Sequence, residues 1–176
     1  MVYHSPVLLH ECIDGLNIKP DGIYVDVTFG GGGHSNLIMS KLSNGKLFAF
    51  DQDKNAINND LKKSGFKIIN ANFRYLKNFL RMEGVTKIDG LLADLGVSSH
   101  QFDVAERGFS TRFNGELDMR MNTNADLSAI EVINDYSEED LANFLFKYGD
   151  LKNSRRISRE IVSARLITKI STTSEL

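Results

Sequence analysis

The sequence has one cysteine, no tryptophan and two prolines among its 176 residues. A lone Cys12 excludes an internal disulfide framework and fits a reducing compartment. The N-terminus has no cationic start, and its apolar run is far too short for a signal peptide or a membrane span. These absences predict a globular protein of the cytoplasm that does not associate with membranes.

An excess of charge of one sign is also missing, since the formal net charge is −2. This near balance argues neither for nor against a nucleic-acid partner. The distribution is less even, because residues 151–176 contain six lysines and arginines and only two acidic residues. With 41% hydrophobic residues, the chain can bury a sizeable core as one domain, or as one domain with a small appendage.

The most informative segment is 26–35, which reads Asp-Val-Thr-Phe-Gly-Gly-Gly-Gly-His-Ser. A hydrophobic strand runs into four glycines and then directly into an expected amphipathic helix over 34–42. Glycines allow the backbone to approach a ligand closely, and the N–H groups at a helix start offer donors and partial positive charge. The segment is therefore typical of a nucleotide-cofactor loop.

Strands and helices alternate through the first half of the chain. Strands are expected before residue 26 and at 46–50, 66–70 and 88–93, with helices at 54–63 and 74–83. This alternation predicts an α/β fold, with a parallel sheet between layers of crossover helices.

The second half has a different pattern. Residues 95–124 form a long polar connection without a clear period, followed by expected helices at 126–134, 137–147 and 154–165. Residues 172–175 have the capping-box pattern of a helix start, yet only Leu176 follows. Together with a sheet of only four strands, this predicts an incomplete sheet and a truncated helical part.

Asp51 ends the second expected strand about twenty residues after the glycines, where a carboxylate can accept hydrogen bonds from ribose hydroxyls. Ser35 stands where the dinucleotide pattern has its third glycine, and His34 and Ser35 suit a methionine carboxylate. S-adenosylmethionine is therefore favoured. Two alternatives stay open: a tight turn with Asp51 as a helix cap, or a metal held by Asp51 and Asp53, although no cluster has zinc spacing.

Asp94 follows the fourth expected strand directly. Ligands of open α/β sheets bind outside the carboxyl ends of the strands, so Asp94 should face the same crevice as Gly32 and Asp51. Its carboxylate can hold the cofactor or accept a proton or hydrogen bond from a reacting amine. The alternative is an aspartate that starts a loop by bonding to its own backbone.

Six motifs, spread over nearly the whole chain, resemble a single family. They are His4-Ser5-Pro6-Val7-Leu8-Leu9-His10-Glu11, segment 26–35, Asp94-Leu95-Gly96-Val97-Ser98-Ser99, Arg107-Gly108-Phe109-Ser110, Asp118-Met119-Arg120-Met121, and Tyr148-Gly149 with Ser154-Arg155-Arg156-Ile157. In this order they are similar to the small-subunit ribosomal RNA methyltransferase H family, also called MraW. That family methylates the exocyclic amine of a cytosine in the decoding region.

The resemblance implies a class I, Rossmann-like S-adenosylmethionine methyltransferase core with a helical insertion domain. We assign the core to 1–112 and the truncated helical insertion to 113–176. The partner implied is small-subunit ribosomal RNA within the small ribosomal subunit. The sequence does not predict the oligomeric state.

Carried over by motif, the resemblance also implies the site residues. The cofactor contacts would be Gly32, Gly33, His34, Asp51, Phe73, Asp94 and Gln101, and no metal ligand is expected. Asp94 is in addition the candidate catalytic residue. Phe73 can stack on adenine, and Gln101 can both donate and accept towards adenine or the target base.

Arginines are the candidates for RNA phosphate. On a helix over 154–165, Arg155, Arg156 and Arg159 would share one face, with Ile157, Ile161 and Ala164 opposite. A plain solvated face is the alternative. Arg107, Arg112 and Arg120 in the long connection are weaker candidates for the same task.

Three features depart from the family pattern. His100 stands where the family usually has proline, Val27 replaces a usually small residue, and the family continues past residue 176. The last departure leaves open a truncated, non-catalytic relative that binds RNA or the ribosome. A nicotinamide-dependent oxidoreductase is a third possibility, which the missing third glycine disfavours.

Overall fold

The computed structural model describes residues 6–176, apart from the side chains of residues 99 and 100. His4 and Ser5 of the N-terminal motif therefore lie outside the described residues, as do the side chains of Ser99 and His100. The chain divides into two compact units. The first runs up to Gly96 and includes Met121–Thr123, and the second comprises Val97–Arg120 and Asn124–Leu176. The expected domains, 1–112 and 113–176, stay a prediction.

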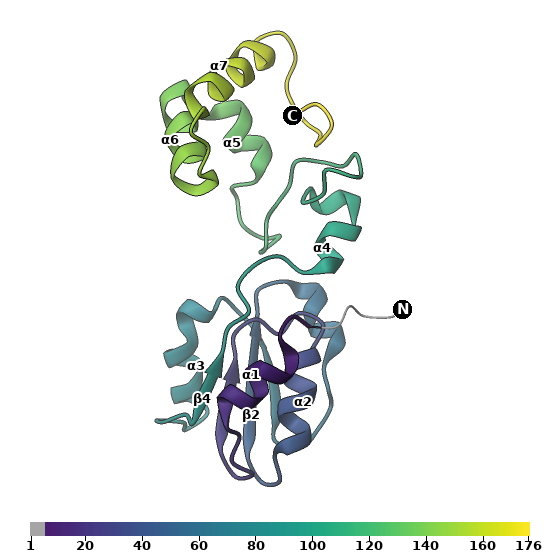
Figure 1. The fold of residues 1–176 in the computed structure, drawn as a ribbon, viewed down its shortest axis with the longest axis vertical. Helices are drawn as coiled ribbons and strands as arrows, with labels where there is room; N and C mark the ends of the chain where they lie inside the picture. Colours follow the sequence, from purple (N-terminus) through teal and green to yellow (C-terminus); the bar gives the residue numbers. More distant parts are fainter. Residues whose placement is uncertain (1–5) are drawn as a thin grey trace. The chain divides into compact units, whose positions relative to one another are not determined.

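The first unit contains a four-stranded sheet with helices on both faces (Figure 1). Its strands are β1 (Ile23–Asp26), β2 (Lys46–Asp51), β3 (Phe66–Asn70) and β4 (Gly90–Leu92). The order is β3-β2-β1-β4, and every neighbouring pair is parallel. The predicted α/β class and Rossmann-like arrangement are confirmed.

Two apolar layers hold the helices on this sheet. The helices are α1 (Leu9–Leu16), α2 (Gly33–Lys41) and α3 (Leu76–Met82). On one face, Ile13 of α1 and Ile38 of α2 pack with Leu47 of the sheet. On the other face, Leu80 of α3 packs with Phe48. Because adjacent strand residues point to opposite faces, the apolar run of β2 supplies both layers.

Some elements differ from the prediction. Helix α1 was not expected, and the expected helix over 54–63 is only a 3₁₀ helix, Lys54–Asn59. The Asp53 side chain accepts a hydrogen bond from Asn55 N, and three asparagines in this short segment disfavour a regular helix. The long connection also contains helix α4 (Ser99–Asp103) and a 3₁₀ turn, Ala105–Arg107.

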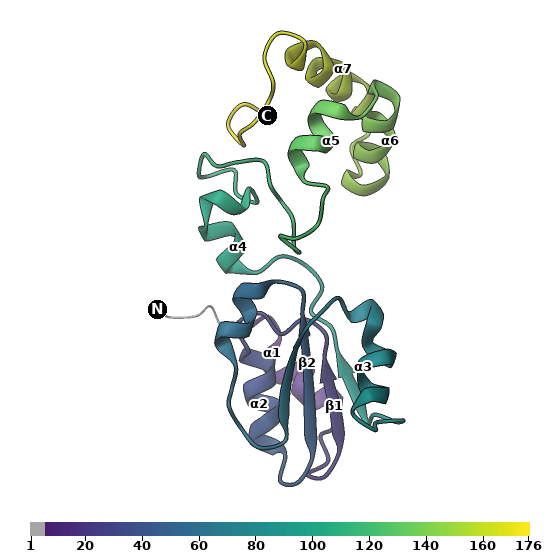
Figure 2. The same ribbon diagram turned by 180° about the vertical axis from the view of Figure 1, so that it is seen from behind.

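The second unit is built on three further helices (Figure 2). These are α5 (Ala129–Asp135), α6 (Glu138–Gly149) and α7 (Ser154–Arg165), close to the predicted ranges. Buried Leu117, Ile133, Leu141 and Ile161 form their common core. The predicted capping box is present near the C-terminus, since Glu175 accepts from Thr172 N at 2.9 Å and donates its N–H to Thr172 Oγ1.

No helix within the described part of the chain combines the length and apolar character needed to cross a membrane.

Candidate functional site

The glycine segment connects β1 to α2 at the carboxyl end of the sheet. Gly30 and Gly32 have φ values of +51° and +77°, which glycine adopts without strain. A Cβ on Gly32 would lie 2.9 Å from the Phe29 ring, whereas a Cβ on Gly30 would meet nothing closer than Thr28 O at 4.0 Å. The loop is therefore tightly packed at Gly32 and open at Gly30.

Asp51, the last residue of β2, holds this loop in place. Its Oδ2 accepts a 2.8 Å hydrogen bond from Gly30 N, and its Oδ1 accepts one of 2.8 Å from Asp53 N. Partial burial raises the pKa of Asp51, while the two backbone donors oppose that shift. Each carboxylate oxygen has a second acceptor position, so Asp51 can still accept hydrogen bonds from a diol.

A second carboxylate, Asp26, lies beneath the loop and was not among the predicted site residues. It is 1% exposed, and its Oδ2 accepts from Ser35 Oγ at 2.7 Å while its Oδ1 accepts from Thr28 N at 3.0 Å. Burial raises the pKa of Asp26. The Ser35 hydroxyl, expected to suit a methionine carboxylate, is instead fully buried against Asp26.

His34 and Gly33 begin α2 under the N-terminal segment of the chain. The buried His34 ring donates from Nε2 to Val7 O at 3.2 Å, which fixes the proton on that nitrogen. A Cβ on Gly33 would lie 2.2 Å from Pro6 Cγ, so Pro6 packs directly on the helix start. The side chain of His34 thus binds the backbone carbonyl of Val7. A cofactor contact from His34 stays a prediction.

Phe73 and Asp94 are the remaining predicted site residues in the first unit. Phe73 starts the 3₁₀ turn Phe73–Tyr75 after β3, and its side chain is 43% exposed. Asp94 is exposed two residues after β4, and its backbone N–H donates to Thr28 Oγ1 at 2.8 Å.

The structure thus brings six of the seven predicted residues to the carboxyl ends of β1, β2, β3 and β4. The seventh, Gln101, lies in the second unit. Its buried side chain accepts a hydrogen bond from Ser98 N at 3.0 Å, and its own N–H donates to Ser98 Oγ. A role of Gln101 beside adenine or the target base stays a prediction.

The predicted arginine face of α7 is present. Arg155, Arg156 and Arg159 are exposed while Ile161 is buried, but Ala164 is exposed, contrary to the prediction. Arg159 Nε lies 3.8 Å from Glu138 Oε1, and both side chains are well exposed.

The weaker arginine candidates support the second unit itself. Arg107 is buried and donates to Arg120 O at 2.9 Å. Arg120 forms an ion pair with Asp118 at 2.6 Å, which lowers the pKa of that carboxyl. Arg112 Nη2 lies 3.5 Å from Asp103. Arg107 and Arg120 are thus occupied by internal contacts.

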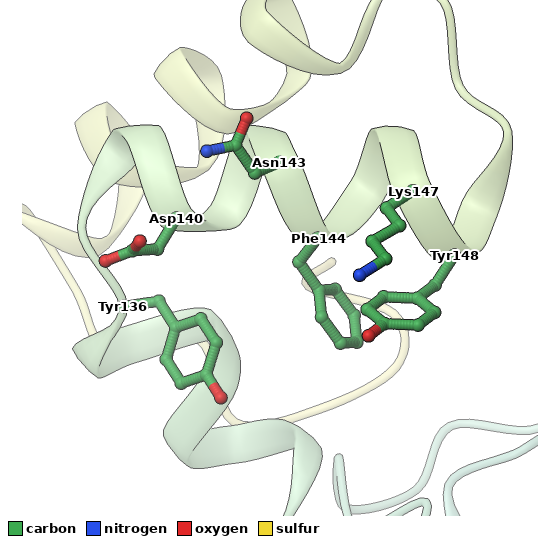
Figure 3. Close-up of a pocket in the computed structure, with 6 residues that line it drawn as sticks. All are labelled: Tyr136, Asp140, Asn143, Phe144, Lys147 and Tyr148. Atoms are coloured by element: carbon green, nitrogen blue, oxygen red, sulfur yellow. The ribbon is translucent and has the colours of Figure 1, made fainter.

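A hollow of about 440 Å³ lies in the second unit, and its lining includes none of the residues predicted for the site (Figure 3). It is lined by Tyr136, Asp140, Asn143, Phe144, Lys147 and Tyr148. A helical face with aromatic residues four positions apart is its only sequence signal, and such a face is more often part of a core.

Comparisons with known proteins agree with the motifs. The model of the family described as MraW methylase family matches residues 1–176. "Ribosomal RNA small subunit methyltransferase H" of Flavobacterium johnsoniae is 62% identical over 177 aligned residues, covering 100% of this chain and 59% of that protein. The protein of the same name from Christiangramia forsetii is 59% identical, with 100% and 59% covered.

This chain therefore spans about 59% of the length of these curated relatives. A solved structure, "The Crystal Structure of a rRNA Methylase from Streptococcus thermophilus to 1.95A", is 23% identical to it. That likeness has a TM-score of 0.35 and covers 46% of this chain and 51% of the other, which is too distant to carry an argument.

Proposed function

Because this chain belongs to the MraW methylase family, we propose that it binds S-adenosylmethionine and serves methyl transfer to small-subunit ribosomal RNA. The proposed acceptor is the exocyclic amine of a cytosine in the decoding region. The observation that carries the proposal is the meeting of an open glycine loop, a half-buried carboxylate and an exposed aromatic ring at the carboxyl ends of parallel strands.

The residues present fit this cofactor part by part. Asp51 has acceptor positions left for the ribose hydroxyls, and the exposed ring of Phe73 offers a stacking surface for adenine. Among the described residues no side chain caps α2 at Gly32, so in this part of the chain the first N–H groups of the helix are available to a methionine carboxylate. When bound, the cofactor supplies a methyl group activated by its attachment to a sulfonium.

Asp94 is the proposed acceptor of the proton. The lone pair of a cytosine amine is delocalised into the ring, so a carboxylate that accepts a hydrogen bond from the amine makes the nitrogen more nucleophilic. When the amine is methylated, its surplus proton would pass to Asp94 and then to water. Thr28 supports this role by holding the Asp94 backbone at 2.8 Å.

The RNA contacts proposed are the exposed arginines of α7 and the amide of Gln101. Guanidinium groups neutralise phosphate, and an enzyme that acts on a base needs that base unstacked. Arg155, Arg156 and Arg159 form the exposed basic face that supports the first part of this proposal.

Calorimetric titration of the purified chain with S-adenosylmethionine tests the cofactor site. We expect saturable binding that weakens at least about tenfold in Asp51→Ala, since the loss of one charge-assisted hydrogen bond costs about 1.5 kcal/mol or more. Asp60→Ala is the matched control, because Asp60 is an exposed carboxylate in the same part of the chain. Circular dichroism would verify that each variant is folded.

The proposal is wrong if the folded chain does not bind S-adenosylmethionine, or if Asp51→Ala binds it as tightly as Asp60→Ala does. Methylation of small ribosomal subunits, measured with radiolabelled cofactor, then tests the proposed acceptor. Binding of RNA without binding of the cofactor would instead support the non-catalytic alternative.

A further inference from the structure

One face of α6, together with Tyr136 just after α5, lines the hollow in the second unit (Figure 3). The α6 residues of this face follow helical spacing and are Asp140, Asn143, Phe144, Lys147 and Tyr148. The hollow, here called the α6 hollow, has a volume of about 440 Å³ and is wide open to solvent. None of its six residues has a role in the site proposed above.

Three aromatic rings meet in the α6 hollow. The Phe144 and Tyr148 centroids are 5.2 Å apart, and the Tyr136 and Phe144 rings meet edge to face at 6.3 Å. Tyr148 is nevertheless 69% exposed and Phe144 38% exposed. Exposed aromatic faces held in place by their neighbours are the surfaces on which proteins stack unpaired bases.

The polar lining supplies the other groups that a nucleotide needs. Lys147 Nζ lies over one face of the Tyr148 ring, 5.3 Å from its centroid, and provides a positive charge at that face. Asp140 and Asn143 line the hollow nearer the start of α6 (Figure 3). The Asp140 carboxylate accepts from Ser137 Oγ at 2.7 Å and has further acceptor positions.

We propose that the α6 hollow binds one unpaired nucleotide of single-stranded RNA, with its base on Phe144 and Tyr148 and its phosphate near Lys147. The inference rests on the proposed function for the source of the RNA, but it concerns a second site. A carboxylate can accept a hydrogen bond from the amine of cytosine, whereas the single N3–H of uracil lies between two carbonyl oxygens that repel a carboxylate, so Asp140 favours cytosine over uracil.

The polar groups of the lining favour this occupant over an apolar protein segment. A carboxylate, an amide and an ammonium group occupy three of the six lining positions, and an apolar partner would have to desolvate all three. In a bound nucleotide, the amine of the base donates to the carboxylate, the base edge bonds to the amide, and the phosphate pairs with the ammonium group.

Helix α6 also offers a matched control. Phe146 is 60% exposed on the same helix but does not line the α6 hollow. Fluorescence anisotropy with a labelled hexacytidylate would measure RNA affinity of the full chain and of three variants, Phe144→Ala, Tyr148→Ala and Phe146→Ala. We expect the first two to weaken binding about 5- to 150-fold, which corresponds to one lost base stack. Phe146→Ala should stay within about twofold of the unmodified chain, the usual scale for a surface substitution.

Two further oligonucleotides sharpen the test. An abasic oligomer of equal length should bind the unmodified chain at least as weakly as hexacytidylate binds Tyr148→Ala, because the abasic oligomer stacks on neither Phe144 nor Tyr148. Hexauridylate should bind less tightly than hexacytidylate, and Asp140→Asn should remove that preference.

Equal effects of Tyr148→Ala and Phe146→Ala, or no binding of hexacytidylate, would overturn the proposal. So would sedimentation showing a self-associated chain that Tyr148→Ala disperses, since the α6 hollow would then be an interface between copies. Titration with S-adenosylmethionine separates the two proposals: the variants of α6 should bind it normally, and failure at the α6 hollow leaves that result intact.

Discussion

The backbone N–H of Asp94 donates a 2.8 Å hydrogen bond to the side-chain oxygen of Thr28. Thr28 follows β1 and Asp94 follows β4, so this bond joins the ends of two neighbouring strands. The same hydroxyl lies 3.4 Å from Oδ1 of the buried Asp26, to which it donates. One threonine therefore connects a buried carboxylate to the backbone of the proposed proton acceptor.

Thr28→Val should weaken this connection while keeping the shape of the side chain. We expect the free energy of unfolding to fall by about 1–3 kcal/mol, because valine removes both hydrogen bonds of the hydroxyl, each with a net value of about 0.5–1.5 kcal/mol. The Asp94 amide should also exchange its hydrogen faster, as measured by NMR. Thr28→Ser keeps the hydroxyl and should protect that amide. Equal protection in Thr28→Val and the unmodified chain would contradict this role.

Asp26→Asn should make stability less dependent on pH. Burial raises the pKa of Asp26 above the usual 3.8, so the folded state holds this proton more tightly than the unfolded state does. The stability of the unmodified chain should therefore fall, relative to Asp26→Asn, as pH rises from about 3.8 through the raised pKa, and the difference should level off above it. Asparagine can still accept from Thr28 N and can donate to Ser35 Oγ.

Thermal unfolding of both proteins across this pH range measures the difference. Asp26 is not the buried proton-binding group described here if the difference in unfolding free energy is constant with pH, or if the unmodified chain gains stability relative to Asp26→Asn as pH rises.

Gly32→Ala should destabilise the chain more than Gly84→Ala does. Both glycines have positive φ, +77° and +71°. Alanine in this left-handed conformation costs about 1–2 kcal/mol at either position. At Gly84 a Cβ meets no atom within 4 Å, whereas at Gly32 it would lie 2.9 Å from Phe29. Overpacking should add about 1–3 kcal/mol at Gly32, measured by urea unfolding. Equal losses would mean that Phe29 moves aside freely.

The sequence predicted most of the sheet because apolar runs separated by turn residues are local signals. Strands β2 and β3 and helix α7 match their expected ranges to within one residue. Helix α1 was missed because it is short and because its N-cap residue, Leu8, has no side-chain capping hydrogen bond. The 3₁₀ segment Lys54–Asn59 was mistaken for a regular helix, since periodicity does not show that Asp53 bonds to the Asn55 backbone.

Placement of the site at the carboxyl ends of the strands followed from the order of the elements. The contacts that shape it did not, because they join residues far apart in the chain. Gly30 and Asp51 are 21 residues apart, and Thr28 and Asp94 are 66 apart. No local pattern encodes such pairs, and a buried aspartate such as Asp26 has the same letter as an exposed one.

Arg165→Lys should destabilise the second unit. The guanidinium of Arg165 donates to Ile133 O and Tyr136 O, each at 2.6 Å, and so binds two carbonyls at the end of α5. Lysine cannot reproduce this two-pronged geometry, so we expect a loss of about 1.5–3 kcal/mol in urea unfolding. Arg159→Lys is the control, since its exposed pair with Glu138 at 3.8 Å should contribute less than about 1 kcal/mol.

Replacing Arg155, Arg156 and Arg159 together by glutamine should lower the salt dependence of RNA binding. Each phosphate contact to a single strand contributes about 0.7 to the slope of log affinity against log salt concentration, so the slope should fall by about 2. The charge-matched control replaces three exposed basic residues of the first unit, Lys77, Arg81 and Lys87, by glutamine. Anisotropy titrations of single-stranded RNA over a range of potassium chloride concentrations would compare the two. Equal slopes in both triple variants would assign the effect to net charge, and the exposed face of α7 would then be an ordinary solvated surface.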